Sequence, residues 1–249
     1  MNSIKHPYGN IKSSVLKNFK LFLSKLIRFF TNIFCKMKDN EEILISSGVY
    51  CPWKDDRQFY TFFKIIKKFT LLDFPRAFTL WKFSKNLSHI KADILDIGCL
   101  LGGSGFLLSK ANTKGRVLLF DTFDGFKKDD GLHTKNTFFF NDVEFVKKNI
   151  KKLKLKNTNV YKSHFPKKLK MKIKKVKICH LDVNTFSETK SCFDYIENKI
   201  VKGGAIIFDD YGIWGVDGIK TFVNSIEKKY QKSYQFVYNY MGQCIMIKR

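Results

Sequence analysis

The sequence lacks the features that define several common classes of protein. Its six cysteines lie far apart and include no C-x-x-C pair, so neither a zinc knuckle nor a disulfide scaffold is indicated, and we expect a cytoplasmic protein. No apolar run approaches the roughly 20 residues of a membrane span. The one candidate is interrupted by Lys17, Lys20, Lys25 and Arg28. The first residues do not resemble a cleaved secretory signal.

Acidic residues are scarce beside basic ones, 22 against 46, which gives a net charge of +24. The lysines are spread over nearly the whole chain, whereas nucleic-acid binders usually concentrate their basic residues on one element. We therefore expect no nucleic-acid partner, and infer that the overall field attracts an anionic or phosphorylated small molecule. The 249 residues, 44% hydrophobic, supply enough core for one large α/β domain or two small ones.

The stretch from Ala92 to Asp121 predicts a strand, a glycine loop, a helix and a second strand. The first strand, Asp93–Ile97, is short and apolar and stops at Gly98, as a buried parallel strand before a tight turn should. The second strand, 116–120, ends at Asp121, which lies 23 residues beyond Gly98. This is near the spacing at which an acidic side chain meets a ribose in nucleotide-binding βαβ units.

The glycine loop also lacks the G-x-G-x-x-G fingerprint of dinucleotide sites. Gly98 is followed by three other residues before Gly102, giving G-x-x-x-G-G-S-G, which favours a ligand without a pyrophosphate. Ser104 can serve the start of the following helix, whose free N–H groups offer a binding position. The alternative is a loop that only turns the chain, and the acidic Asp121 argues against it.

Three carboxylates follow two other predicted strands. Asp182 comes after VKICHL, and Asp209 with Asp210 comes after AIIF. Because the carboxyl ends of neighbouring parallel strands meet at one edge, we expect these acids beside the glycine loop. Like charges this close need a cation or a shifted pKa. Mg²⁺ prefers oxygen ligands, and Asn184 or Glu188 could supply a further ligand oxygen. The alternative is a set of acids that cap helices.

The rest of the chain alternates predicted strands and helices and ends in a hairpin, 234–240 and 243–248, with a turn expected at Gly203–Gly204. This pattern predicts an α/β fold with a doubly wound, mostly parallel, seven-stranded sheet. We divide the chain into an N-terminal helical extension, 1–88, which includes a candidate lid, and a sheet domain, 89–249. A basic amphipathic helix in the extension is expected to pack on its own domain or on a second subunit, rather than on a membrane.

Four motifs, in this order, resemble those of the TylF/MycF family of metal-dependent sugar O-methyltransferases. They are Gly98–Ser104, Asp121–Phe126, Leu181–Asn184 and Gly203–Gly212. The resemblance covers roughly residues 93–229. It implies a Rossmann-like class I methyltransferase fold that uses S-adenosylmethionine, together with Mg²⁺ or Mn²⁺.

Carried over residue by residue, the resemblance implies that Asp121 holds the ribose of the cofactor. Asp182, Asp209 and Asp210 would be the metal ligands, although Asn184 stands where family members tend to have a second acid. His133, in an L-H-x-x-N setting, or Asp182 would be the catalytic proton acceptor. The residues predicted to bind the cofactor are Gly98, Cys99, Gly102, Gly103, Ser104, Asp121, Thr122, Phe123, His164 and Phe165.

The resemblance also implies the acceptor. Relatives with divergent N-termini belong to bacterial capsule and lipopolysaccharide synthesis, where the acceptor is a nucleotide-linked sugar such as a GDP-heptose. Its diphosphate would agree with the basic chain. We further expect a homo-oligomer, a dimer or tetramer. Two alternatives stay open: a nicotinamide-dependent oxidoreductase of similar fold, and a basic, membrane- or RNA-attached protein without enzymatic activity.

Overall fold

The computed structural model describes residues 51–126, 136–140, 142–167, 169, 171–213 and 216–249, and further positions between 19 and 30. The chain divides into two compact units, Met1–Lys54 and Asp55–Arg249. The described positions between 19 and 30 are helical and belong to the N-terminal extension, for which the sequence predicts an amphipathic helix. The sheet and the site lie in the second unit. The functional division at residue 88 stays a prediction.

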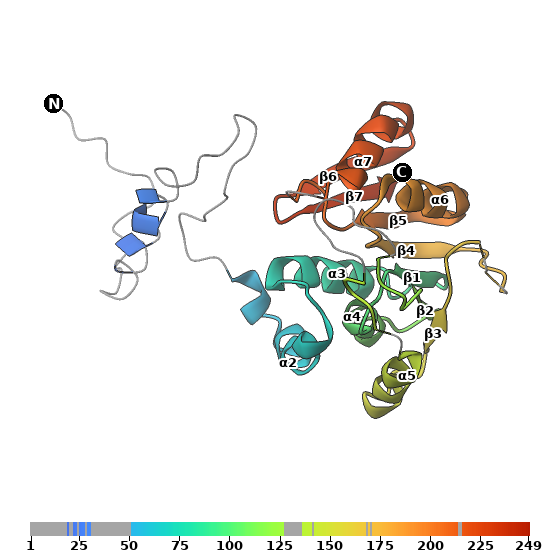
Figure 1. Cartoon of the computed structure of the whole chain (residues 1–249), viewed down its shortest axis with the longest axis horizontal. Coiled ribbons are helices and arrows are strands. Elements are labelled where there is room, and N and C mark those ends of the chain that lie inside the picture. The colour runs from blue at the N-terminus through green and yellow to red at the C-terminus, as the bar shows by residue number, and fades with distance from the viewer. Residues whose placement is uncertain are drawn as a thin grey trace. The chain divides into compact units, whose positions relative to one another are not determined.

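Seven strands of the described chain form one sheet in the order β3-β2-β1-β4-β5-β7-β6 (Figure 1). Strands β1 to β5 pair in parallel, and β7 runs antiparallel between β5 and β6. The predicted doubly wound, mostly parallel sheet is confirmed. The strands are β1 (Asp93–Ile97), β2 (Val117–Asp121), β3 (Thr158–Lys162), β4 (Val176–Leu181), β5 (Ile200–Phe208), β6 (Tyr234–Asn239) and β7 (Gln243–Lys248).

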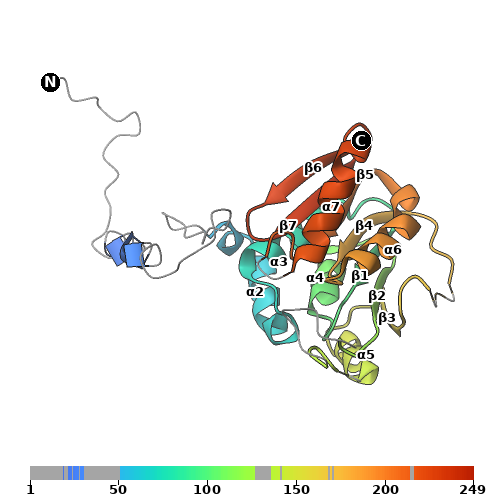
Figure 2. The same cartoon turned by 45° about the horizontal axis from the view of Figure 1, so that its top comes forward.

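Helices cover both faces of this sheet, α6 and α7 on one and α3 and α4 on the other (Figure 2). On the first face, Phe193 of α6 and Phe222 of α7 pack on Phe208 of β5. On the second face, a Cβ on Gly105 of α4 would meet Leu119 of β2. The helices are η1 (Pro52–Lys54), α2 (Arg57–Ile66), η2 (Lys67–Phe69), α3 (Phe74–Asn86), α4 (Gly103–Ala111), α5 (Val143–Lys152), α6 (Phe186–Ile196), η3 (Glu197–Lys199) and α7 (Asp217–Tyr230).

Helix α3 begins at Phe74, directly after a side-chain N-cap. The side chain of Asp73 accepts a hydrogen bond from the backbone N of Arg76 at 2.8 Å, as an N-cap does, and Pro75 occupies the first turn. The helix packs on α4. This start places the Arg76 side chain next to the carboxyl end of the sheet.

The turn expected at Gly203–Gly204 is wrong, because both glycines belong to β5, which begins at Ile200. A Cβ on Gly204 would come within 2.9 Å of the Lys177 carbonyl oxygen, and the pairing of β4 with β5 shifts register near this point. Gly204 therefore serves a close approach, and Gly203, with φ +74°, serves an irregularity within a strand, whereas a glycine pair usually suggests a turn.

No helix among the described residues is both long and apolar enough to cross a lipid bilayer.

Candidate active site

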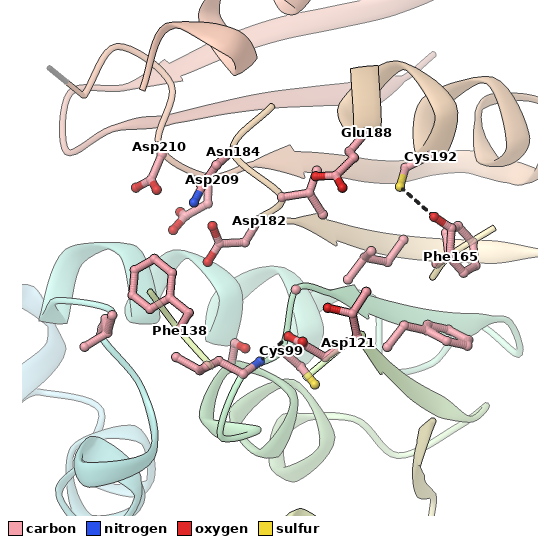
Figure 3. Close-up of a pocket in the computed structure, with 18 of the residues that line it drawn as sticks. Cys99, Asp121, Phe138, Phe165, Asp182, Asn184, Glu188, Cys192, Asp209 and Asp210 are labelled. Atoms are coloured by element: carbon pink, nitrogen blue, oxygen red, sulfur yellow. Dashed lines mark hydrogen bonds between the residues drawn. The ribbon is translucent and has the colours of Figure 1, made fainter. Parts of the chain in front are cut away.

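A cavity of about 580 Å³ opens at the carboxyl ends of β1, β2, β4 and β5. The predicted loop and the predicted acids border it together. In Figure 3, Cys99 and Asp121 lie on one side of the cavity, and Asp182, Asp209 and Asp210 lie on the other. The expectation that strand-end acids gather beside the glycine loop is therefore met in space.

The glycine loop is held close to the neighbouring strand end. Gly98 has φ +88°, and a Cβ there would lie 1.9 Å from the carbonyl oxygen of Asp182. Only glycine fits both the left-handed backbone and this contact. The first glycine of the motif thus brings the loop after β1 against the end of β4.

Asp121 joins two loops at the cavity wall. Its Oδ2 accepts a hydrogen bond from the backbone N of Leu100 at 2.8 Å, and its Oδ1 accepts one from the backbone N of Phe123 at 2.7 Å. Burial raises the pKa of the Asp121 carboxyl, although both backbone donors oppose the rise. The carboxylate is fixed in direction, and each oxygen keeps a lone pair for a ligand hydroxyl.

A buried chain of polar side chains runs beneath the cavity from the loop to the acids. Ser104 donates to Asp96 Oδ2 at 2.8 Å, and Asp96 Oδ1 lies 2.7 Å from His180 Nδ1. His180 Nε2 lies 3.9 Å from Asp209 Oδ1. Burial opposes protonation of His180, but Asp209 and Asp96 outweigh it and raise its pKa to about 10. A buried imidazolium thus stands between two carboxylates.

Asp182, Asp209 and Asp210, which we call the carboxylate rim, carry unequal proton affinities. Burial and the charges of Asp209 and Asp210 raise the pKa of Asp182 well above its ordinary value. Burial also acts on Asp209, but the positive charges of His180 and Arg76 and the Gln243 amide outweigh it and lower its pKa. Asp182 is therefore the member of the rim best suited to take up a proton.

A guanidinium already lies in this rim. Arg76 Nη1 donates to Asp209 Oδ2 at 2.8 Å and to Asp210 Oδ1 at 2.9 Å. Gln243 Nε2 donates to the other oxygen, Asp209 Oδ1, at 2.7 Å. Asn184, which lines the same cavity, has a buried Oδ1 without a hydrogen-bond partner among the described residues.

The structure brings most of the predicted site residues to the cavity wall. Those that line it are Gly98, Cys99, Ser104, Asp121, Thr122, His164, Phe165, Asp182, Asp209 and Asp210. Gly102, Gly103 and Phe123 are not among the wall residues. A Cβ on Gly102 would meet the ring of Phe106, one on Gly103 would meet the carbonyl of Phe69, and Phe123 is fully buried. His133 lies outside the described residues.

Sequence reasoning missed Arg76 and the segment Phe69–Leu72, which also line the cavity. One signal was available for Arg76. The chain has only five arginines among its 46 basic residues, and arginine suits buried carboxylate pairs better than lysine because its planar fork donates in several directions. A rare arginine close to a helix start was a candidate for such a pair.

This fold and this site define a class. A seven-stranded sheet with antiparallel β7, a glycine loop after β1 and an acid after β2 is the arrangement of Rossmann-like class I methyltransferases. The family described as Macrocin-O-methyltransferase (TylF) matches residues 84–234, and the chain belongs to this family. It is an S-adenosylmethionine-dependent O-methyltransferase, which decides against the oxidoreductase and the non-enzymatic alternatives.

Solved structures share the fold at low sequence identity. The chain is similar to the O-methyltransferase NovP, with a TM-score of 0.63, 16% identity, and coverage of 72% of this chain and 82% of that one. It is similar to the calicheamicin methyltransferase CalS11, with a TM-score of 0.58, 10% identity, and coverage of 85% and 99%. It is also similar to an O-methyltransferase from Bacillus cereus in complex with SAH, with a TM-score of 0.53, 14% identity, and coverage of 92% of this chain and 100% of that one. No curated protein matches the sequence.

Proposed function

We propose that the protein transfers the methyl group of S-adenosylmethionine to a sugar hydroxyl, with the help of a divalent metal ion. The observation that carries the proposal is the cavity in which the glycine loop and the carboxylate rim face each other. The loop suits the nucleoside end of the cofactor and the rim suits a cation and an acceptor oxygen. One cavity thus offers places for both partners of an alkyl transfer.

The donor side of the cavity fits the cofactor. Asp121 has both oxygens oriented by backbone donors and lies at the wall, where it can accept hydrogen bonds from a ribose. His164 and Phe165 lie on the same wall, and we assign them to the adenosine. Cys99 adds an apolar surface, since burial keeps its thiol protonated by raising its pKa.

The rim fits a divalent ion in its chemistry. It offers oxygen donors only, as Mg²⁺ and Mn²⁺ prefer, and the unpartnered Oδ1 of Asn184 lies beside it. Among the described residues, no three His, Cys, Asp or Glu side chains are already arranged to hold a metal ion, and Arg76 contacts two of the acids. We assign the ion to Asp182, Asp209 and Asp210, with Asn184 beside them.

The chemistry at the acceptor is the loss of a proton and attack on a methyl group. A bound divalent ion would lower the pKa of the acceptor hydroxyl and fix its direction. We assign uptake of the proton to Asp182, which lines the cavity. His133 stays a predicted alternative, outside the described residues. The loop would hold the methyl donor in line with the oxygen.

We propose a nucleotide-linked sugar, such as a GDP-heptose for a bacterial surface polysaccharide, as the acceptor. The net charge of +24 favours a diphosphate. One CalS11 structure is described as a TDP-rhamnose 3'-O-methyltransferase, so this fold accommodates such an acceptor in another protein. The Phe69–Leu72 segment and Phe138 line the cavity and offer apolar surface to the sugar.

Mass spectrometry tests the proposal. The protein is incubated with S-adenosylmethionine, Mg²⁺ and a panel of nucleotide sugars, with and without EDTA, and the products are searched for a gain of one methyl group. We expect one sugar to be methylated and EDTA to stop the reaction. Asp209→Asn should lower turnover at least about 100-fold. Asp93→Asn is the matched control and should leave turnover unchanged, because Asp93 is a buried acid at the end of β1 away from the cavity. Full activity in EDTA would remove the metal from the proposal.

A further inference from the structure

Arg76 reaches the carboxylate rim from outside the residues 84–234 that the family match includes. Its Nη1 bridges Asp209 Oδ2 and Asp210 Oδ1, and its Nε donates to Asp73 Oδ2 at 3.2 Å. The side chain is only 16% exposed, and the Asp209 side chain only 1%. One guanidinium therefore contacts two acids of the rim while its Nε stays bound to the N-cap residue of its own helix.

The oxygens that Arg76 uses are among those that a divalent ion would need. Asp209 Oδ1 already accepts from Gln243, so Oδ2 is the other oxygen of that carboxylate, and Arg76 occupies it. Two cations on the same oxygens repel each other, and burial leaves this repulsion poorly screened. Arginine does not lose its proton in proteins, so Arg76 has to move for an ion to bind.

The structure provides a second anion for the displaced guanidinium. Asp73 holds Arg76 Nε, and its side chain is 39% exposed, so an arginine that turns toward it reaches solvent. The cap of α3 does not depend on the arginine side chain, because Asp73 Oδ1 accepts from the backbone N of Arg76. Movement of Arg76 therefore leaves the helix start intact.

We propose that Arg76 is the resident counter-ion of the metal site: it competes with the divalent ion for Asp209 and Asp210, and turns toward Asp73 when the ion binds. The inference rests on the metal dependence in the proposed function. It makes Arg76 a positioning residue that holds the carboxylate pair in place without metal and weakens the affinity for the ion.

Mn²⁺ binding tests the inference without any turnover. The full-length protein, stripped with EDTA and dialysed, is titrated with Mn²⁺ alone by calorimetry. We expect Arg76→Gln to lower the Kd at least about tenfold, the factor that ~1.4 kcal/mol represents. Arg116→Gln is the matched control. Arg116 also makes an ion pair, with Asp93, but at the amino end of β1, so its loss should leave the Kd unchanged.

Arg76→Lys is the second variant, and it is titrated in the same way if Arg76→Gln does not fold. Lysine retains the charge but loses the planar guanidinium, whose Nη1 contacts Asp209 and Asp210 while its Nε contacts Asp73. Its Kd should therefore fall between those of the wild type and Arg76→Gln. A Kd equal to or above the wild-type value in whichever Arg76 variant folds overturns the inference. So does equal tightening in Arg116→Gln.

Failure of the inference is distinct from failure of the proposed function. Tighter Mn²⁺ binding by Arg76→Gln in a protein that methylates no tested sugar supports the inference and counts against the proposed acceptor. Methylation of a sugar in EDTA, by a protein that binds no Mn²⁺ in any of these forms, overturns the inference and keeps the sugar.

Discussion

Strand β4 buries two cations, one toward each end, and their surroundings differ. Among the described residues, Lys177 Nζ donates to three neutral oxygens: the Ile90 carbonyl at 2.9 Å, and Asn112 Oδ1 and the Lys114 carbonyl at 2.7 Å. Burial lowers its pKa to about 8. His180, three residues further along, faces the carboxylates of Asp96 and Asp209. These acids outweigh burial and raise its pKa to about 10.

The difference separates a structural end of the sheet from a functional one. At the amino end, a lysine satisfies three carbonyl-type acceptors, at the cost of a buried charge that makes no direct ion pair within the described part of the chain. At the carboxyl end, like charges are concentrated, and they stay in the fold because His180 and Arg76 supply positive charge. A cation site needs several acids beside a cavity, although their mutual repulsion destabilises the fold.

The largest effect is expected from removal of the His180 charge. His180→Asn leaves Asp96 and Asp209 buried without the imidazolium between them, and should cost about 3–5 kcal/mol in the free energy of unfolding. Urea unfolding in EDTA measures it. A cost below that of the Lys177 substitution would show that the two ends do not differ in this way.

Lys177→Met should cost less, about 1–3 kcal/mol, because it leaves neutral acceptors without a donor but leaves no unpaired charge. The same urea titration measures it. Methyl transfer by the folded variant should stay at the wild-type rate, since Lys177 does not line the cavity. A large loss of turnover in a fully folded Lys177→Met protein would contradict a purely structural role for the amino end of the sheet.

The two cations should make stability depend on pH with opposite signs. The pKa of His180 rises from 6.5 to about 10 on folding, so its contribution is complete below pH 6.5 and is lost as the pH rises toward 10. The pKa of Lys177 falls from 10.5 to about 8, so its penalty is relieved as the pH rises from 8 to 10.5.

Unfolding free energies measured at a series of pH values check these signs. We expect His180→Asn to remove most of the decline that begins at pH 6.5. We expect Lys177→Met to make the decline above pH 8 steeper than in the wild type, because the opposing gain is gone. If the unfolding free energies of the wild type and both variants changed with pH in parallel, neither His180 nor Lys177 would be the cause of the pH dependence.

The smallest effect is expected at the start of the buried chain. Ser104→Ala removes one hydrogen bond to Asp96 and should weaken S-adenosylmethionine binding roughly threefold to tenfold, as one hydrogen bond is worth about 1 kcal/mol. Calorimetry with S-adenosylmethionine measures it. The pH profile of His180 should persist, since Asp96 Oδ1 keeps its contact with the imidazole.

The sequence predicted the features that depend on short segments, which are the strand ends and the acids that follow them. The bounds of β1 and β4 follow from short apolar runs that stop at Gly98 and Asp182, and the gathering of acids follows from parallel pairing alone. Gly203–Gly204 misled us because glycine marks both turns and close contacts between strands. The contact of Arg76 with Asp209 spans 133 residues, and no periodicity within α3 could have indicated it.

The contact between Gly98 and the Asp182 carbonyl has a mechanical consequence. Since not even a methyl group fits between them, the turn that would carry the sulfonium and the strand end that would carry the base are in backbone contact. The reacting atoms would then keep their spacing without help from any lid. Access by the acceptor is left to the other walls, so selectivity among sugars can evolve there while the separation of donor and base stays the same.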